Sequence, residues 1–304
     1  MAQDVSQMPL VIEAAMTQVI ANTDGKLPTT AGIVREALDC VEAGAGMLHY
    51  HHDFSLNKED SIGQCIEVQR AILKEHPDAL VYPGYLSGKT HEETMEHLEP
   101  IYEAGVMSMF AFDPGHATHA RPDENGEPTR SHLGGTSFDQ ATRMVEDSWR
   151  YNAPVSLGIF EPGPIKWVRY FGANGRFTPG TVVKFYFPGD ASWGVKGVGA
   201  TFGIPPSKAA LDIYLSMIEG SGLPWMVSIL GGAILESELP RYILEKGGNI
   251  RVGIEDPLRP MDMSNVEMVR AVVELASEVG RPVATASQAR SVLADGRQAV
   301  TEDA

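Results

Sequence analysis

The sequence contains little cysteine and no long apolar run. Cys40 and Cys65 are the two cysteines among 304 residues, which is too few for a disulfide framework, and both lie in stretches with a helical pattern. The longest apolar runs have the length of strands, so we expect no membrane span. The N-terminus also lacks the basic segment and apolar stretch of a signal peptide. These absences favour a cytoplasmic protein with two buried thiols.

Basic residues are scarce as well. The chain has 24 Lys and Arg against 40 Asp and Glu, a formal net charge of −16. Nucleic acids and anionic membranes both require a basic surface, so neither is an expected partner. The chain also has no G-x-G-x-x-G after its first strand and no G-x-x-x-x-G-K-[ST], which disfavours dinucleotide and P-loop chemistry. A small anionic ligand needs only a local cluster of donors, so the substrate has to be identified from the site.

Short apolar, β-branched runs alternate with helical patterns along the chain. We expect strands at 10–17, 47–52, 79–85, 107–113, 154–160, 182–188, 225–230 and 249–255. Helical patterns occupy 30–43, 58–75, 91–104, 137–151, 206–220, 235–246 and 264–279, and 162–179 gives the weakest one. This alternation predicts an α/β fold, a single-domain (β/α)8 barrel over residues 1–304 with short flexible ends near 1–8 and 296–304. A doubly wound open sheet is the alternative.

The longest irregular stretch is residues 113–136, "DPGHATHARPDENGEPTRSHLGGT". Loops of this length in a compact domain are usually lids or partly disordered. This one leaves the C-terminal end of the strand 107–113, the end where barrel active sites lie. His116 and His119 within it are a second candidate metal pair, although a mobile surface explains them more simply.

Histidines are concentrated early in the chain. All nine precede position 133, and the stretch "GMLHYHHDFS" holds His49, His51 and His52. Because side chains alternate along a strand, His49 and His51 point the same way, about 7 Å apart along the strand. Two such imidazoles can bind one divalent metal. A merely hydrogen-bonded pair is the alternative, since a lone H-x-H is a weak signal.

A third ligand from the later strands has to be a carboxylate. Candidates at strand ends are Asp113, Glu161, Asp190 and Glu255. In "GGNIRVGIEDP" (247–257), alternation places Arg251 and Glu255 on one face, with Asp256 next. Strands two and eight both flank strand one in a closed barrel, so His49, His51 and Glu255 can converge. Two histidines and a carboxylate with open positions are typical of catalytic zinc, although non-haem iron uses similar ligands.

With H-x-H and "GGNIRVGIEDP" together, the chain resembles the β-keto acid cleavage enzyme family from about Pro9 to Leu293. Further shared segments are "EAGAGMLHYHH", "GIFEPG" and "ASEVGRPVATASQARSVL". The resemblance implies a zinc-dependent barrel enzyme, an acyltransferase that converts a β-keto acid and acetyl-CoA into acetoacetate and a new acyl-CoA. It also implies a homo-oligomer, a dimer or tetramer.

The resemblance further implies roles for individual residues. His49, His51 and Glu255 match the zinc ligands, Arg251 matches the catalytic arginine, and Asp256 matches the acid/base partner. These residue types suit the chemistry, because a metal polarises a ketone, a carboxylate accepts an α-proton and a neighbouring arginine holds that carboxylate ionised.

One departure from the family bears on the substrate. In a member whose substrate carries an amino group, an acidic residue just after the first strand receives that group. The matching position here is Ile20, which cannot do so. We therefore expect a β-keto acid with an apolar or polar neutral tail.

Three further residues are candidates for substrate contact: Glu161, Ser87 and Glu13. Glu161 follows the fifth strand, and Glu13 lies within the first, where a salt-bridged position is as reasonable. The family's hydroxyl positions have alternatives: Tyr82, Gly84 or Ser87 on the third strand, and Ser108 or Met109 on the fourth.

The phosphates of CoA require cationic contacts. Candidates are Lys166, Arg169, Arg176, Lys184 and Lys196, although each is explained as well by a solvated surface charge. Two other functions fit the same ligands: a CoA-independent, metal-assisted carbon–carbon lyase or hydrolase, and a non-catalytic metal-binding barrel. Arg251 and Asp256 argue against the last, because an inactive site has no need for a charged pair beside the metal.

Overall fold

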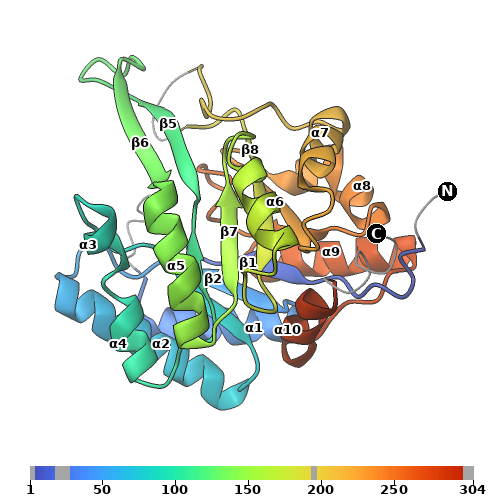
Figure 1. The fold of residues 1–304 in the computed structure, drawn as a ribbon, viewed down its shortest axis with the longest axis horizontal. Coiled ribbons are helices and arrows are strands. Elements are labelled where there is room, and N and C mark those ends of the chain that lie inside the picture. Colours follow the sequence, from blue (N-terminus) through green and yellow to red (C-terminus); the bar gives the residue numbers. More distant parts are fainter. Residues whose placement is uncertain (1–3, 18–27, 193–196, 297–304) are drawn as a thin grey trace.

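The computed structural model describes residues 4–17, 28–192 and 197–296. Eight parallel strands form one curved sheet in the order β3-β2-β1-β10-β9-β8-β7-β4, with helices outside it (Figure 1). The strands are β1 (Ile12–Ala15), β2 (Met47–Tyr50), β3 (Leu80–Pro83), β4 (Phe110–Phe112), β7 (Val155–Ile159), β8 (Val182–Pro188), β9 (Trp225–Leu230) and β10 (Asn249–Val252). The predicted (β/α)8 barrel is confirmed.

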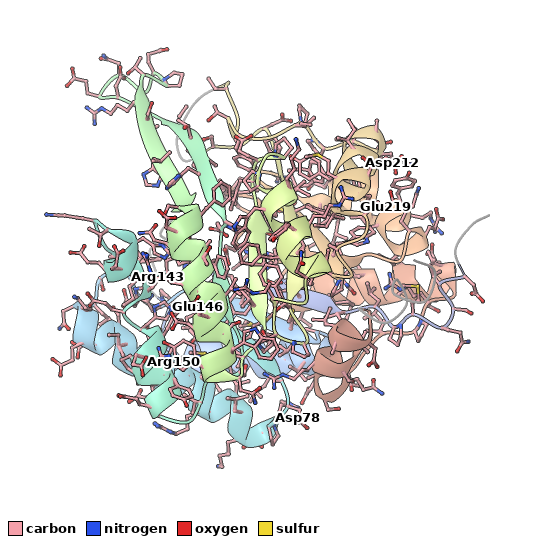
Figure 2. All side chains as sticks on the ribbon, viewed as in Figure 1. Asp78, Arg143, Glu146, Arg150, Asp212 and Glu219 are labelled. Carbon is pink, nitrogen blue, oxygen red and sulfur yellow. The ribbon has the colours of Figure 1, made fainter. Side chains whose placement is uncertain are left out.

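The helices surround this sheet. They are α1 (Thr30–Ala43), α2 (Lys58–Glu75), α3 (His91–Met95), α4 (Leu98–Glu103), α5 (Phe138–Tyr151), α6 (Ile165–Ala173), α7 (Lys208–Ile218), α8 (Leu239–Glu245), α9 (Asn265–Val279) and α10 (Ala286–Asp295), with a 3-10 turn at Ile234–Glu236. Their charged side chains point outward, as Arg143, Glu146 and Arg150 of α5 do (Figure 2). None of these described helices is both long and apolar enough to cross a bilayer.

The predicted helix 91–104 is two helices, α3 and α4. Pro100 explains the break, because its ring has no N–H and collides with the carbonyl four residues earlier in a continuous helix. α6 forms where the weakest helical pattern lies, and α10 was not predicted. Ala289 and Leu293 of α10 pack with Met47 and Leu80, the first residues of their strands. α10 therefore covers the N-terminal end of the barrel, which leaves the C-terminal end for a site.

The stretch 113–136 is a β-hairpin, which corrects the prediction of a long irregular loop. β5 (Gly115–Arg121) and β6 (Arg130–Thr136) pair antiparallel and extend away from the barrel (Figure 1). The mostly polar sequence concealed the strands, because they are half-exposed and have no apolar face. His116 and His119 are three residues apart on one strand and so point to opposite faces. They do not form the second metal pair considered above.

The seam between β3 and β4 is closed by a side chain. These two strands stand at the ends of the hydrogen-bonded order. Ser108, just before β4, bridges them, because its Oγ accepts from Val81 N at 2.8 Å and donates to Val81 O at 2.9 Å. The Ser108 side chain thus takes the place of backbone hydrogen bonds between β3 and β4. Met109 packs inside the barrel.

Replacing Ser108→Ala should leave the Val81 N–H and C=O unpaired in the wall of the barrel. We expect the free energy of unfolding in urea to fall by about 1–3 kcal/mol, the cost of orphaned buried polar groups. Ser131→Ala, at an exposed position of β6, is the matched control and should change stability little. Equal stabilities of the two variants would show that Ser108 does not close the barrel.

Candidate active site

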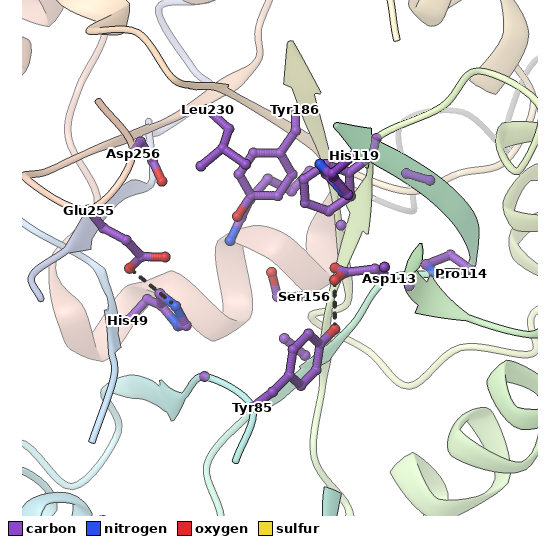
Figure 3. Close-up of a pocket in the computed structure, with 18 of the residues that line it drawn as sticks. His49, Tyr85, Asp113, Pro114, His119, Ser156, Tyr186, Leu230, Glu255 and Asp256 are labelled. Atoms are coloured by element: carbon purple, nitrogen blue, oxygen red, sulfur yellow. Dashed lines mark hydrogen bonds and ion pairs between the residues drawn. The ribbon is translucent and has the colours of Figure 1, made fainter. Parts of the chain in front are cut away.

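A cavity of about 330 Å³ opens at the C-terminal ends of the strands. Its lining comes from β2, β3, β4, β7, β8, β9 and β10 and from the segments that follow them, and the β5–β6 hairpin forms one wall. Figure 3 shows His49, Glu255 and Asp256 on one side and Asp113 and Tyr85 on the other. The hairpin therefore borders the cavity, as expected for the segment after strand 107–113.

Two histidines and one glutamate converge at this cavity. His49 Nε2 lies 3.3 Å from His51 Nε2 and 3.3 Å from Glu255 Oε2, and His51 Nε2 lies 3.2 Å from Glu255 Oε1. Within the described residues, these three form the group that could hold a metal ion. A tetrahedral zinc ion with bonds of about 2.0–2.1 Å holds its ligand atoms about 3.3–3.4 Å apart, so the donor spacing fits zinc.

Local backbone geometry brings the three side chains together. β1 pairs with both β2 and β10, with Ala15 opposite His49 and Ala14 opposite Val252. β10 ends at Val252, and the chain bends at Gly253, whose φ is +145°. A Cβ at Gly253 would lie 2.1 Å from Ala15 O, so only glycine fits there. The bend, rather than the predicted strand alternation to residue 255, directs Glu255 into the cavity.

His51 is held by its neighbours rather than by the strand. It lies just beyond β2, and its backbone N–H donates to the Thr17 hydroxyl. Its imidazole lies on Gly84, where an added Cβ would be 2.1 Å from His51 Cε1. The absence of a side chain at Gly84 therefore makes room for the ring.

The protonation states suit a cation. Burial lowers the pKa of His49 to about 4, so its imidazole is neutral near pH 7. Burial tends to raise the pKa of Glu255, but the charge of Arg251 and the two histidines hold it well below its usual range. A neutral imidazole and an ionised carboxylate are the forms that bind metals.

Arg251 lies beneath the three converging side chains and contacts three carboxylates. Its Nη1 donates to Glu13 Oε1 at 2.7 Å, and its Nη2 donates to Glu255 Oε1 and Asp256 Oδ1, each at 2.7 Å. Its Nε donates to Asp256 Oδ2 at 2.9 Å, and the Ser228 hydroxyl donates to the same oxygen. The guanidinium therefore fixes the positions of all three carboxylates.

A second buried network adjoins Arg251. Lys184 Nζ donates to Glu13 Oε1 at 2.7 Å and to the Tyr82 hydroxyl at 2.6 Å, and that hydroxyl donates to Glu13. Three buried carboxylates, those of Glu13, Glu255 and Asp256, thus face two buried cations, Arg251 and Lys184. The excess negative charge makes the group receptive to a divalent cation.

The pKa of Asp256 is raised. Burial is the main cause, and the Arg251 charge offsets only part of it. Asp256 lines the cavity beside Glu255. It is therefore a carboxylate with increased basicity next to a possible metal site.

The three predicted substrate contacts differ in their position relative to the cavity. Glu161 is half-buried and lines the cavity. Glu13 is fully buried beneath Arg251 and Lys184 and is not among the lining residues. Ser87 is exposed and off the cavity, and Gly84 and Tyr85 of the same segment face it instead.

The structure also shows where most of the other predicted residues lie. Asp113 lines the far wall, while Asp190 is exposed and is not a lining residue. Lys184 is buried, so it is not a solvated charge and does not lie on the surface. Ile20 and Lys196 lie outside the described residues.

Sequence analysis missed several cavity residues. Tyr85 and Tyr186 line the cavity, as does Ser156, whose hydroxyl oxygen lies 3.3 Å from that of Tyr82. Side chains alternate along the strand 182–188, so Tyr186 shares a face with Lys184. This alternation could have indicated Tyr186 from the sequence. Tyr85 follows β3 in an irregular segment, where no sequence period indicates direction.

Solved structures similar to this chain share its fold. Hydroxymethylglutaryl-CoA lyase from Pseudomonas aeruginosa superposes with a TM-score of 0.55 at 12% identity, covering 98% of this chain and 94% of that one. A truncated 3-deoxy-D-arabino-heptulosonate 7-phosphate synthase from Thermotoga maritima gives 0.54 at 14% identity, covering 92% and 91%. At these identities the likeness concerns the barrel alone.

Comparisons of sequence say more about the family of this chain. The 3-keto-5-aminohexanoate cleavage enzyme of Acetoanaerobium sticklandii is 27% identical over 303 residues, covering 93% of this chain and 97% of that protein. The 3-oxoadipate:acetyl-CoA acetyltransferase of Cupriavidus necator is 44% identical over 59 residues, covering 18% of this chain and 21% of that protein. The model of the β-keto acid cleavage enzyme family matches residues 9–294. The chain therefore belongs to the β-keto acid cleavage enzyme family.

Proposed function

We propose that this enzyme is an acyltransferase that converts a β-keto acid and acetyl-CoA into acetoacetate and a new acyl-CoA. The observation that carries the proposal is the triangle of His49, His51 and Glu255 beside the buried Arg251–Asp256 pair, in a chain of this family. A relative named as an acetyl-CoA acetyltransferase supports acetyl-CoA as the second substrate. We further propose a cytoplasmic homo-oligomer of single-domain chains, as the family resemblance implies.

We propose that His49, His51 and Glu255 hold a zinc ion. The two imidazole nitrogens lie 3.3 Å apart, and each lies 3.2–3.3 Å from one of the two Glu255 carboxylate oxygens, spacings that suit tetrahedral zinc. Three protein ligands would leave a position open for substrate. When bound, zinc supplies Lewis-acid polarisation of a carbonyl oxygen. The excess buried negative charge around Arg251 favours a cation at this place.

Asp256 is the proton acceptor of the proposed reaction. Arg251 and Ser228 orient its carboxylate, and its raised pKa makes it a better base than a solvated aspartate. It takes a proton from the carbon between the keto and carboxylate groups. That carbon bonds to the acetyl carbonyl as CoA thiolate leaves; the thiolate then attacks the original keto carbon, and the carbon–carbon bond breaks. Asp256 returns its proton to the carbon of acetoacetate.

Gly84→Ala should weaken metal binding without altering a ligand. The new methyl group would overlap the His51 imidazole, which would have to leave the triangle. We expect zinc affinity, measured by competition with a chromophoric chelator, to fall by about 10–100-fold, the range seen when support of a ligand is lost. Gly63→Ala is the matched control, because its Cβ would meet nothing within 4 Å. Unchanged affinity in Gly84→Ala would contradict the assignment of His51.

The reaction itself is tested by following acetoacetate with each substrate alone and with both. We expect product only when a β-keto acid and acetyl-CoA are both present, and loss of activity after chelation. Turnover without acetyl-CoA would favour the lyase or hydrolase alternative, and no turnover of any β-keto acid would favour a non-catalytic barrel.

Asp256→Asn should lower kcat by about 10²–10⁴-fold, because the amide cannot accept the proton. Its zinc content should stay that of the wild type, which separates loss of the base from loss of the metal. Asp190→Asn, at an exposed aspartate off the cavity, should keep full activity. Near-normal kcat in Asp256→Asn would remove Asp256 from the proposed mechanism.

A further inference from the structure

A second carboxylate lies across the cavity from the proposed metal site. Asp113 follows β4 and Tyr85 follows β3, and the Tyr85 hydroxyl donates to Asp113 Oδ2 at 2.8 Å. Both residues line the cavity, and Figure 3 shows the pair on the side away from His49 and Glu255. A substrate whose keto-acid end lies at the metal site would direct its tail towards this pair.

The Asp113 carboxylate is held in place, and one of its oxygens is available to accept a hydrogen bond. Its backbone carbonyl accepts from Thr136 N at 2.8 Å, which ties it to the base of the hairpin. Its Oδ1 lies over Gly158, where an added Cβ would be only 2.1 Å away. Glycine on β7 therefore makes room for a carboxylate that comes from the neighbouring strand. Among the described residues, Oδ1 has no hydrogen-bond donor.

The surroundings of Asp113 leave its charge uncompensated. Burial raises its pKa to about 6, and the Tyr85 hydrogen bond and the charges of Lys184 and Arg251 only partly oppose this. Those two cations are already paired, Lys184 with Glu13 and Arg251 with three carboxylates. Near pH 7 the carboxylate is therefore mainly ionised and without a cationic partner of its own.

Aromatic rings adjoin the same part of the cavity. Tyr186 stacks on Phe160 with ring centroids 4.6 Å apart and planes 6° apart. A Cβ at Gly158 would also meet the Tyr186 ring at 3.3 Å, so this ring borders the space beside Asp113. These rings give that part of the cavity an apolar wall beside the Asp113 carboxylate.

We propose that Asp113 and Tyr85 form the subsite for the substrate tail and select a β-keto acid that ends in an ammonium group. This inference rests on the proposed function, which places the keto-acid end at the metal site. Ile20 led us to expect a neutral tail, because the segment after β1 has no acidic residue at that position. Here the acidic residue is Asp113, which follows β4. The ammonium donates to Oδ1, while Tyr85 holds Oδ2 and orients the carboxylate.

The test is a binding comparison by calorimetry on the protein as purified. The probes are ω-amino carboxylic acids with four to six carbons, the unsubstituted acids of the same length, and the matching dicarboxylic acids. We expect the best amino acid to bind about 10–100-fold more tightly than its unsubstituted partner, the worth of one charged hydrogen-bonded pair. The dicarboxylic acids should bind most weakly, because their second carboxylate meets Asp113.

Asp113→Asn should abolish the preference for the amino acids, and Asp190→Asn should keep it. Tyr85→Phe retains the Asp113 charge and should reduce the preference for amino acids without abolishing it. Melting temperatures of the variants show whether they are folded. Equal binding of amino and unsubstituted acids to the wild type, or preference for a dicarboxylic acid, would overturn the tail subsite. Absence of acetoacetate formation from every β-keto acid would instead refute the proposed function, while the binding comparison would still decide on Asp113.

Discussion

The site depends on one buried guanidinium. Arg251 donates to Glu13, Glu255 and Asp256. Without it, Glu13 would keep its pairing with Lys184, but Glu255 and Asp256 would lose the guanidinium that compensates their buried charges. Removing one partner from such a cluster costs about 3–5 kcal/mol, because the remaining charges are left unpaired. Arg251 therefore fixes the carboxylate that completes the metal triangle and the one proposed to move a proton. Structure and chemistry here depend on the same side chain.

Two glycines give the arrangement its shape. Gly253 turns the chain at the end of β10, and Gly84 leaves room for the His51 ring. At both positions a methyl group would overlap a neighbour at about 2.1 Å. The converging side chains thus rely on close backbone approaches as much as on charge.

Much of this arrangement could be predicted from the sequence. Alternation of apolar runs and helical patterns predicted the barrel, and H-x-H with the later "RVGIED" placed His49, His51 and Glu255 at one mouth because strands two and eight flank strand one. The barrel is confirmed, and the three side chains do meet. The roles assigned to them remain proposals.

The sequence could not predict features set by tertiary contacts. The hairpin 115–136 lacks an apolar face, so its strands carried no period-two signal. Lys184 looked like a surface charge because nothing in its segment shows that Glu13, on a distant strand, neutralises it. The pairing of Asp113 with Tyr85 likewise depends on the empty space at Gly158, which only the folded sheet reveals.

The most direct test of the central claim is anomalous diffraction at the zinc edge on crystals grown with zinc. The account predicts one strong peak within about 2.3 Å of His49 Nε2, His51 Nε2 and a Glu255 carboxylate oxygen, and loss of that peak in His49→Ala. No peak at this triangle, or a peak held by other residues while the triangle stays empty, would contradict it.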